Sequence, residues 1–342
     1  MVTSSHPRRV LIVGWGFLGA AVGNRMRDEG LDVVALTRCE SARTHAARLE
    51  GIKVLIGDAS DPAVIAHAMA DVDHVLCAAG GLLPVAAAAR PLEDIKAAFS
   101  PLLTILERLR TEPSAWLTYI SSGGTVYGNP ARVPACEADP TRPISAYGVS
   151  RRACELYAEM YSRTYGFPVQ ILRVSNVYGP GQSPDRSQGA VAVFLHRLAA
   201  GLPLAIVGDG SALRDYVYVS DVADVVTRIV ADQLDVGTVN LGSGCGTTVL
   251  SLARELGEII GVEPVLDFLP ARSQDVHAIT LDIARLRSFI DYAPIDLHRG
   301  LQLTWHHVLA GQLAADRATP SHPPVIQVAA EAHGLEQSDA AS

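Results

Sequence analysis

Short apolar runs alternate with segments of helical length through the first half of the chain. The apolar runs predict buried strands at residues 10–13, 32–36, 54–56, 74–78, 117–120 and 169–174. The segments between several of them predict helices at residues 19–29, 62–70, 92–110 and 147–165. Strands that are apolar along most of their length and alternate with helices are typical of a parallel sheet covered on both faces. We therefore predict an α/β fold with a doubly wound parallel sheet, which binds ligands at the carboxyl ends of its strands.

This alternation weakens after about Asn176, where a loop rich in glycine, proline and glutamine begins. Helices are predicted at 190–200 and 248–261, and short strands at 204–207 and 265–269. We predict a nucleotide-binding domain at 1–176 with a later return segment at about 212–240. Residues 177–211 and 241–312 are predicted to form a smaller C-terminal substrate-binding domain. The segment 313–342 has little periodicity and is predicted to be a flexible tail.

Composition and charge narrow the class of protein. The chain has 342 residues, of which 49% are hydrophobic, so it has ample material for a packed core. Its formal net charge of −8 argues against non-specific nucleic-acid binding, which needs a basic face. No apolar run reaches the length of a membrane span, and the polar N-terminus does not look like a signal peptide. The five cysteines lack metal-ligand spacing, so we expect no metal, reduced thiols and a cytoplasmic location.

A glycine-rich turn follows the first predicted strand and opens the first predicted helix. Gly14, Gly16 and Gly19 form a Gly-x-Gly-x-x-Gly pattern that encloses Phe17 and Leu18. Glycines in this pattern allow a tight turn, a close approach of the backbone to a pyrophosphate, and packing of the helix on the strand. The helix N-terminus adds free N–H groups and a positive dipole end. Strand, turn and helix agree, so we predict a Rossmann-type dinucleotide site.

The end of the second predicted strand bears on the choice of dinucleotide. Thr37 and Arg38 stand where a carboxylate would bind the ribose hydroxyls of NAD. An arginine at this place accommodates the 2′-phosphate of NADP instead. A solvated surface arginine is the alternative. We predict NADP as the preferred cofactor, with NAD as the other possibility.

Tyr147 and Arg151 are four residues apart on a predicted helix and therefore share one face. A cation beside a phenol favours its deprotonated form, so this spacing suits a tyrosine that moves a proton. A surface helix that merely carries both residues is the alternative. The pair becomes a catalytic candidate because a cofactor turn lies upstream of it.

Several motifs in order resemble the NAD(P)-dependent nucleotide-sugar epimerase/dehydratase family of the extended short-chain dehydrogenase/reductase superfamily, and within it the UDP-glucose 4-epimerase group. They are Tyr147-x-x-x-Arg151, where the family carries lysine in the last position, RVSNVYGPG at 173–181, GDG at 208–210, RDY at 214–216, NLGSG at 240–244, and Arg272-x-x-Asp275. The likeness runs from about Arg9 to Trp305. It implies an NAD(P)-dependent enzyme that acts on a nucleotide-diphosphate sugar, and a homodimer joined through the helices at 92–110 and 147–165.

The resemblance also implies roles for single residues. Asp58, Ala78, Ala79, Gly80 and Ser175 fall at cofactor-binding positions, as do Tyr147 and Arg151. Asn176, Ala205, Val207, Arg214, Arg272 and Asp275 fall at substrate-binding positions. The planar forks of Arg214 and Arg272 suit a diphosphate. For either arginine an ion pair with an Asp or Glu is the alternative, and Asp215 stands next to Arg214.

The predicted catalytic centre departs from the family at three positions. Gly123 stands where the family has its catalytic Ser or Thr, and Ala98 where it has an Asn. Arg151 replaces the lysine and cannot release a proton. Ser122, next to Gly123, is the candidate that replaces the missing hydroxyl. The acid pair that marks the family's dehydratases is absent, which disfavours dehydration.

Three functions therefore stay open from the sequence. The first is a UDP-hexose 4-epimerase that oxidises C4 transiently, with Tyr147 as the base. The second is an NADPH-dependent 4-ketoreductase of nucleotide-linked keto sugars, towards which Arg38 points. The third is a catalytically impaired protein that binds NADP and a nucleotide sugar, which the altered centre suggests.

Overall fold

A seven-stranded parallel sheet forms the centre of the fold. The structure is a computed structural model that describes residues 7–184 and 189–318. The strand order is β3-β2-β1-β4-β5-β6-β10, and every pair is parallel. The strands are β1 (Arg9–Val13), β2 (Asp32–Thr37), β3 (Lys53–Ile56), β4 (His74–Cys77), β5 (Trp116–Ser122), β6 (Val169–Val174) and β10 (Thr238–Leu241). The strand order reverses direction between β1 and β4, which is where a doubly wound sheet opens a ligand crevice.

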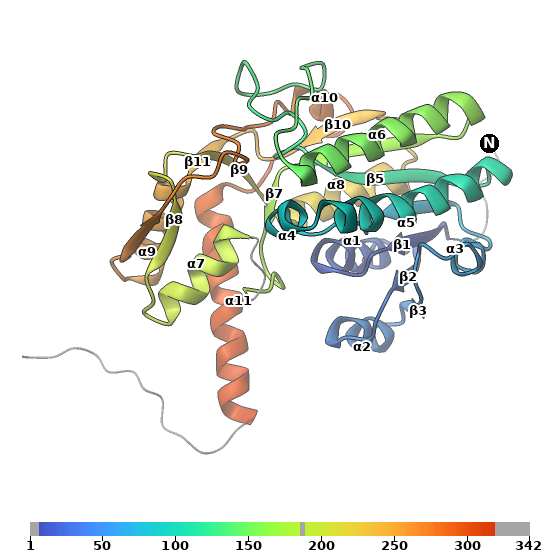
Figure 1. Cartoon of the computed structure of the whole chain (residues 1–342). Helices are drawn as coiled ribbons and strands as arrows, with labels where there is room; N and C mark the ends of the chain where they lie inside the picture. Colours follow the sequence, from blue (N-terminus) through green and yellow to red (C-terminus); the bar gives the residue numbers. More distant parts are fainter. Residues whose placement is uncertain (1–6, 185–188, 319–342) are drawn as a thin grey trace, which may run out of the picture.

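Helices cover both faces of this sheet (Figure 1). One face packs against α1 (Phe17–Asp28), α2 (Ala42–Leu49), α8 (Val219–Ala231) and α10 (Ala284–Arg287). The other packs against α3 (Pro62–Ala68), α5 (Pro91–Thr111) and α6 (Ala146–Tyr165), and α4 (Pro84–Ala89) adjoins α5 and α6. The central strands are apolar because both faces are buried: Leu11 and Ile12 of β1 are fully buried on opposite faces. The predicted doubly wound α/β fold is confirmed.

A smaller region lies beyond the carboxyl end of the sheet. It contains a three-stranded sheet of β7 (Asn176–Tyr178), β9 (Leu213–Tyr218) and β11 (Gly246–Thr248), and a parallel pair of β8 (Leu204–Val207) and β12 (Leu266–Leu269). The helices α7 (Ala190–Ala199), α9 (Val249–Ile260) and α11 (Leu297–Ala318) pack around a separate apolar cluster there. In Figure 1, α7 and α9 lie in the smaller region, whereas α8, which stands between them in the chain, packs on the large sheet.

Two elements differ from the prediction. Helix α8 was not predicted as a helix and fell within the return segment at about 212–240, although nine of its thirteen residues are buried and its apolar residues repeat at helical spacing. Helix α11 runs to Ala318, into the segment predicted as a tail from 313. Alanine-rich sequence favours helix even where the apolar period is lost. Residues 319–342 of the predicted tail lie outside the described residues. No described helix is long and apolar enough to cross a membrane.

Candidate active site

The glycine-rich turn between β1 and α1 has the geometry that a pyrophosphate requires. Gly14 has φ +105°, and a Cβ there would lie 2.7 Å from the backbone nitrogen of Ala79. A Cβ on Gly19 would lie 2.0 Å from the carbonyl oxygen of Gly14. Gly16, in contrast, has nothing within 4 Å of its Cβ position, and as N-cap of α1 it provides no side-chain cap. The first N–H groups of α1, at Phe17 and Leu18, therefore face an open space that suits a dinucleotide diphosphate.

The remaining predicted cofactor residues lie at the carboxyl ends of neighbouring strands. Thr37 ends β2 and exposed Arg38 follows it. Asp58 follows β3 and accepts a hydrogen bond from the backbone nitrogen of Ser60 at 2.8 Å. This bond lowers the pKa of the Asp58 carboxyl, and the charge of Arg38 contributes in the same direction. Ala78, Ala79 and Gly80 follow β4, with Ala79 against Gly14.

A cavity of about 550 Å³ opens between the large sheet and the smaller region. Phe17 and Leu18 line it from the cofactor side, and Ser122, Ser145 and Tyr147 line it from β5 and the start of α6. Ser145 caps α6 by accepting a hydrogen bond from the nitrogen of Gly148 at 3.2 Å. A Cβ on Gly148 would lie 2.9 Å from the carbonyl oxygen of Thr125. Glycine at this position therefore lets α6 approach the turn after β5 and brings Tyr147 to the same cavity as Ser122.

The backbone direction after β5 explains the glycine at 123. A Cβ on Gly123 would point to Leu281, 2.6 Å from its Cδ1, and to the carbonyl oxygen of Arg173 at 2.7 Å. Gly123 does not line the cavity, whereas Ser122 and Thr125 do. A hydroxyl at position 123 would thus face away from the ligand space. The motif spacing aligns Gly123 with the family's catalytic Ser or Thr. In the structure, the hydroxyl-bearing residues of this turn that line the cavity are Ser122 and Thr125.

Arg151 lies behind Tyr147 and not in the cavity lining. Its guanidinium carbon is 4.8 Å from the centre of the Tyr147 ring. One nitrogen donates to the carbonyl oxygen of Gly80, and another donates to the Tyr119 hydroxyl at 3.3 Å. Burial raises the pKa of Tyr119 well above its ordinary value, so this second phenol stays protonated. The fixed charge of Arg151 therefore acts on Tyr147, and its predicted contact with the cofactor stays a prediction.

The cavity is rich in positive charge although the protein is acidic. Among the lining residues that the structure describes, the arginines are Arg43, Arg214 and Arg272, and the single carboxylate is Asp275. Arg214 donates to the carbonyl oxygen of Leu213 at 2.8 Å and forms no ion pair with any residue that the structure describes. Burial lowers the pKa of its guanidinium, opposed by the attraction of Tyr216 and Asp275. An unpaired, partly desolvated guanidinium of this kind is stabilised by an anionic ligand.

Asp215 does not neutralise Arg214, its neighbour in the chain. Its carboxylate is buried and accepts hydrogen bonds from Ser175 Oγ at 3.1 Å and from the nitrogen and Oγ of Ser243, both at 2.8 Å. Its carbonyl oxygen accepts a bond from the Asn176 side chain at 3.0 Å. Asp215 thereby holds Ser175 and Asn176 at the cavity wall. The predicted roles, cofactor binding for Ser175 and substrate binding for Asn176, stay predictions. The alternative of a local Arg214–Asp215 ion pair is absent here.

Not every predicted residue lies at this cavity. Ala205 and Val207 lie on β8 and are not part of the lining. Several lining residues were not predicted as site residues. They are Arg43, Leu83, Pro84, Val85, Thr125, Tyr178, Gln182, Tyr216, Val249, Gln274 and Val276, among others. Some lie inside the recognised motifs, such as Tyr178 and Tyr216, where no role was assigned to them, and others, such as Arg43 and Val249, come from segments without a recognisable motif.

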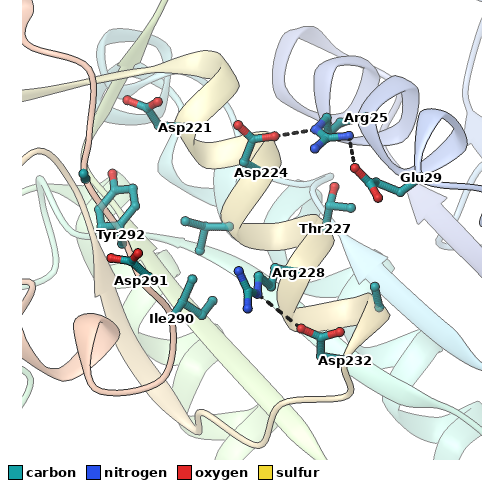
Figure 2. A pocket seen from close by; sticks show the side chains of 13 residues that line it. Arg25, Glu29, Asp221, Asp224, Thr227, Arg228, Asp232, Ile290, Asp291 and Tyr292 are labelled. Carbon is teal, nitrogen blue, oxygen red and sulfur yellow. Dashed lines mark hydrogen bonds and ion pairs between the residues drawn. The ribbon is translucent and has the colours of Figure 1, made fainter.

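A second hollow, of about 510 Å³, lies on the outer side of α1 and α8 (Figure 2). Its arginines are already neutralised: Arg25 pairs with Asp224 and Glu29, and Arg228 pairs with Asp232. It has no glycine-rich turn and is remote from Tyr147. The described residues contain no cluster of three or more His, Cys, Asp or Glu that could hold a metal ion. The candidate site is therefore the cavity at the carboxyl end of the sheet.

Comparison with known proteins agrees with this choice. The family model described as "NAD dependent epimerase/dehydratase family" matches residues 10–242. The UDP-glucose 4-epimerase of Mycolicibacterium smegmatis is 31% identical over 311 residues, which are 86% of this chain and 97% of the relative. The dTDP-4-dehydro-6-deoxyglucose reductase of Escherichia coli is 30% identical over 178 residues, 52% of this chain and 56% of the relative.

A solved structure extends the similarity to three dimensions. The UDP-glucose 4-epimerase of Thermotoga maritima, determined with UDP-glucose, has a TM-score of 0.83 and 30% sequence identity. The match covers 89% of this chain and 99% of the other.

Proposed function

Because the chain belongs to the NAD dependent epimerase/dehydratase family, and is thus an enzyme of the extended short-chain dehydrogenase/reductase superfamily, we propose that it is a nucleotide-sugar 4-epimerase of the UDP-hexose type. One observation carries the proposal. Tyr147 and Ser122 line a single cavity together with the exposed Arg272 and with Arg214, which forms no ion pair among the described residues. Such a cavity suits a ligand that has a sugar at one end and a diphosphate at the other.

The cofactor groove fits a dinucleotide by its own geometry. The open space at Gly16 and the uncapped N-terminus of α1 would hold the diphosphate, with Ala78 to Gly80 beside the adenosine half. A bound nicotinamide would supply the acceptor for the hydride of C4 and return that hydride to the other face of the sugar. We further propose that Arg38 makes NADP(H) the preferred dinucleotide.

The protein side of the reaction rests on Tyr147. Its phenolate would take the proton of the C4 hydroxyl, with Ser122 donating a hydrogen bond to the developing oxyanion. The guanidinium of Arg151, 4.8 Å from the ring centre, would stabilise the negative phenolate without exchanging a proton itself. Arg214 and Arg272 would bind the diphosphate, and Asn176 would bind it beside them.

A second candidate is a 4-ketoreductase of nucleotide-linked keto sugars, for which Tyr147 would donate the proton. Arg38 favours it, because net reduction consumes NADPH, and so does the similarity to the reductase of Escherichia coli. A protein that binds these ligands without turnover is the third candidate, which the Arg151 and Ala98 departures motivate.

The three candidates give different products in two parallel incubations. Purified protein is mixed with UDP-glucose, with and without added NAD or NADP, and separately with a 4-keto nucleotide sugar and NADPH, and the sugars and the nicotinamide absorbance are followed. The first proposal expects the C4 epimer with no net change in the cofactor. A 4-keto nucleotide sugar reduced with stoichiometric loss of NADPH, and no epimer from UDP-glucose, would replace it with the second. Binding of a panel of nucleotide sugars without turnover, unchanged by Arg151→Lys, would leave the third.

We also propose a homodimer formed through α5 and α6. Helix α6 exposes Val149, Leu156, Tyr157 and Met160, and α5 exposes Leu92 and Ile95. Apolar side chains gathered on adjacent helices are typical of an interface. Replacing Leu156→Glu and Met160→Glu together is expected to convert a dimer to a monomer in light scattering after size exclusion. Leu49→Glu, on α2, is the control that should leave the mass unchanged, and a monomeric wild type would refute the proposal. The predicted cytoplasmic location is tested by cell fractionation.

A further inference from the structure

Two arginines near the carboxyl end of β2 form no ion pair in the part of the chain that the structure describes, although the charge of Arg38 acts on Asp58 from a longer distance. Arg38 follows the strand directly and is exposed. Arg43 lies in the first turn of α2, is half-buried, and lines the cavity that contains Tyr147. Arg48, on the same helix as Arg43, is instead paired with Glu40. Two guanidinium groups without an ion pair among the described residues leave positive charge near this strand-to-helix connection that a ligand would balance.

The carboxylates near this connection are already engaged. Both oxygens of Glu40 accept hydrogen bonds from Arg48 at 2.7 Å, and one also accepts a bond from Thr44 at 2.9 Å. The bond from Arg48, followed by that from Thr44, lowers the pKa of Glu40 to about 2. Asp58 is held by the nitrogen of Ser60. Among the described residues, Glu40 is thus engaged through both oxygens and Asp58 through one, which leaves less carboxylate to bind the ribose hydroxyls of NAD.

Arg43 extends from α2 towards the cofactor turn. One of its nitrogens donates to the carbonyl oxygen of Gly181, and its other donors have no hydrogen bond among the described residues. A Cβ on Gly181 would lie 3.9 Å from Cδ2 of Phe17, the first residue of α1. The guanidinium therefore reaches from the start of α2 to the loop residue Gly181, which itself lies near the start of α1. The N-terminus of α2 itself is closed by the capping box of Ser41 and Thr44, so the arginine side chains are the anion donors here.

We propose that Arg43 is a second specificity residue, which together with Arg38 forms a two-arginine site for the 2′-phosphate of NADP(H). A phosphate monoester has three acceptor oxygens and about two negative charges, so it can take forks from two directions. Arg38 comes from the end of β2 and Arg43 from the first turn of α2, on either side of the connection that follows the strand. This proposal rests on the NADP(H) preference of the proposed function, and it predicts that the selectivity depends on both arginines.

Binding without turnover tests the site separately from the reaction. Dissociation constants for NADPH and NADH are measured by nicotinamide fluorescence at one ionic strength, without any sugar nucleotide. Wild type is expected to bind NADPH more tightly. Arg38→Gln and Arg43→Gln are each expected to weaken NADPH about 10- to 100-fold and to change NADH less than about twofold. Arg43→Lys, which keeps the charge and loses the fork, should fall between wild type and Arg43→Gln.

Arg254→Gln provides the matched control, because it removes the same charge from an exposed arginine on α9 that forms no ion pair within the described part of the chain. It should leave both constants unchanged, and thermal melting verifies that each variant is folded. Equal losses of NADPH and NADH in Arg43→Gln would overturn the proposal, since they would place Arg43 on the diphosphate that both dinucleotides share. An unchanged affinity of Arg43→Gln for NADPH would also overturn the proposal. A failed epimerase assay with the selective loss intact would refute the reaction and leave this site standing.

Discussion

Replacing Tyr147 with phenylalanine is expected to lower kcat about 10²- to 10⁴-fold, the usual contribution of a positioned acid or base. The substitution removes only the phenol oxygen and keeps the ring over which Arg151 lies at 4.8 Å. The cavity wall should therefore remain intact, and the arginines that would bind the diphosphate are untouched. Calorimetric binding of the nucleotide sugar is expected to change less than about threefold, which separates loss of chemistry from loss of binding.

Tyr165→Phe is the control for this substitution. It makes the same chemical change at the last residue of the same helix, where the side chain is exposed and far from the cavity. Its kcat should equal that of wild type in a progress curve of epimer formation. If Tyr147→Phe kept more than about a tenth of wild-type activity, another group would be the base. Tyr119 is a poor substitute, because burial raises its pKa well above the ordinary range.

Local patterns sufficed to predict the large sheet because each strand signal is short and self-contained. Six of its strands were predicted within a residue or two from apolar runs, and β1 with its glycine turn gave the cofactor groove. The edge strand β10 was not predicted, because its four residues include the buried polar Asn240 and overlap the NLGSG motif at 240–244. Burial of a polar residue depends on partners that are distant in sequence, which no local pattern contains.

The site was predictable where a motif fixed the backbone and not where only the fold brings side chains together. Tyr147, Asn176 and Arg214 were found from motifs and do line one cavity. Arg43 carries no motif, and its contact with Gly181 joins residues 138 positions apart. At position 123 a motif was recognised, but the direction of the side chain could not be predicted from it. The spacing indicated a lost catalytic hydroxyl, whereas a Cβ at this position would point to Leu281, because the backbone at the end of β5 sets its direction.

Glu155→Gln is expected to destabilise the fold by about 3–5 kcal/mol, the typical cost of breaking a buried ion pair from one side. Glu155 on α6 is fully buried and accepts hydrogen bonds from Arg173 of β6 at 2.9 and 3.2 Å. It also accepts bonds from Arg152 at 2.8 Å and from the hydroxyl of Ser121. The neutral amide keeps the shape but leaves the buried Arg173 guanidinium without a counter-charge.

The Glu155→Gln substitution is also expected to lower the rate of the reaction, because Ser121, which donates to Glu155, immediately precedes Ser122 at the end of β5. The bond between Ser121 and Glu155 ties that strand end to the helix that carries Tyr147. Loosening it is expected to lower kcat more than the affinity for the nucleotide sugar, since positioning of the two hydroxyls matters most in the transition state.

Unfolding in urea measures the stability effect against an exposed ion pair of the same kind. Arg228→Gln breaks the pair with Asp232 at 3.3 Å on the surface of α8, and should cost less than about 1 kcal/mol because solvent screens both charges. Each variant removes one charge, but Glu155 pairs with both Arg173 and Arg152, so the contrast reports burial together with that second pair. A loss below about 1 kcal/mol in Glu155→Gln would contradict this account of the buried pair. The bond from Arg173 to the Tyr127 hydroxyl at 3.0 Å is already present in the wild type and is neutral, so it cannot replace the lost counter-charge.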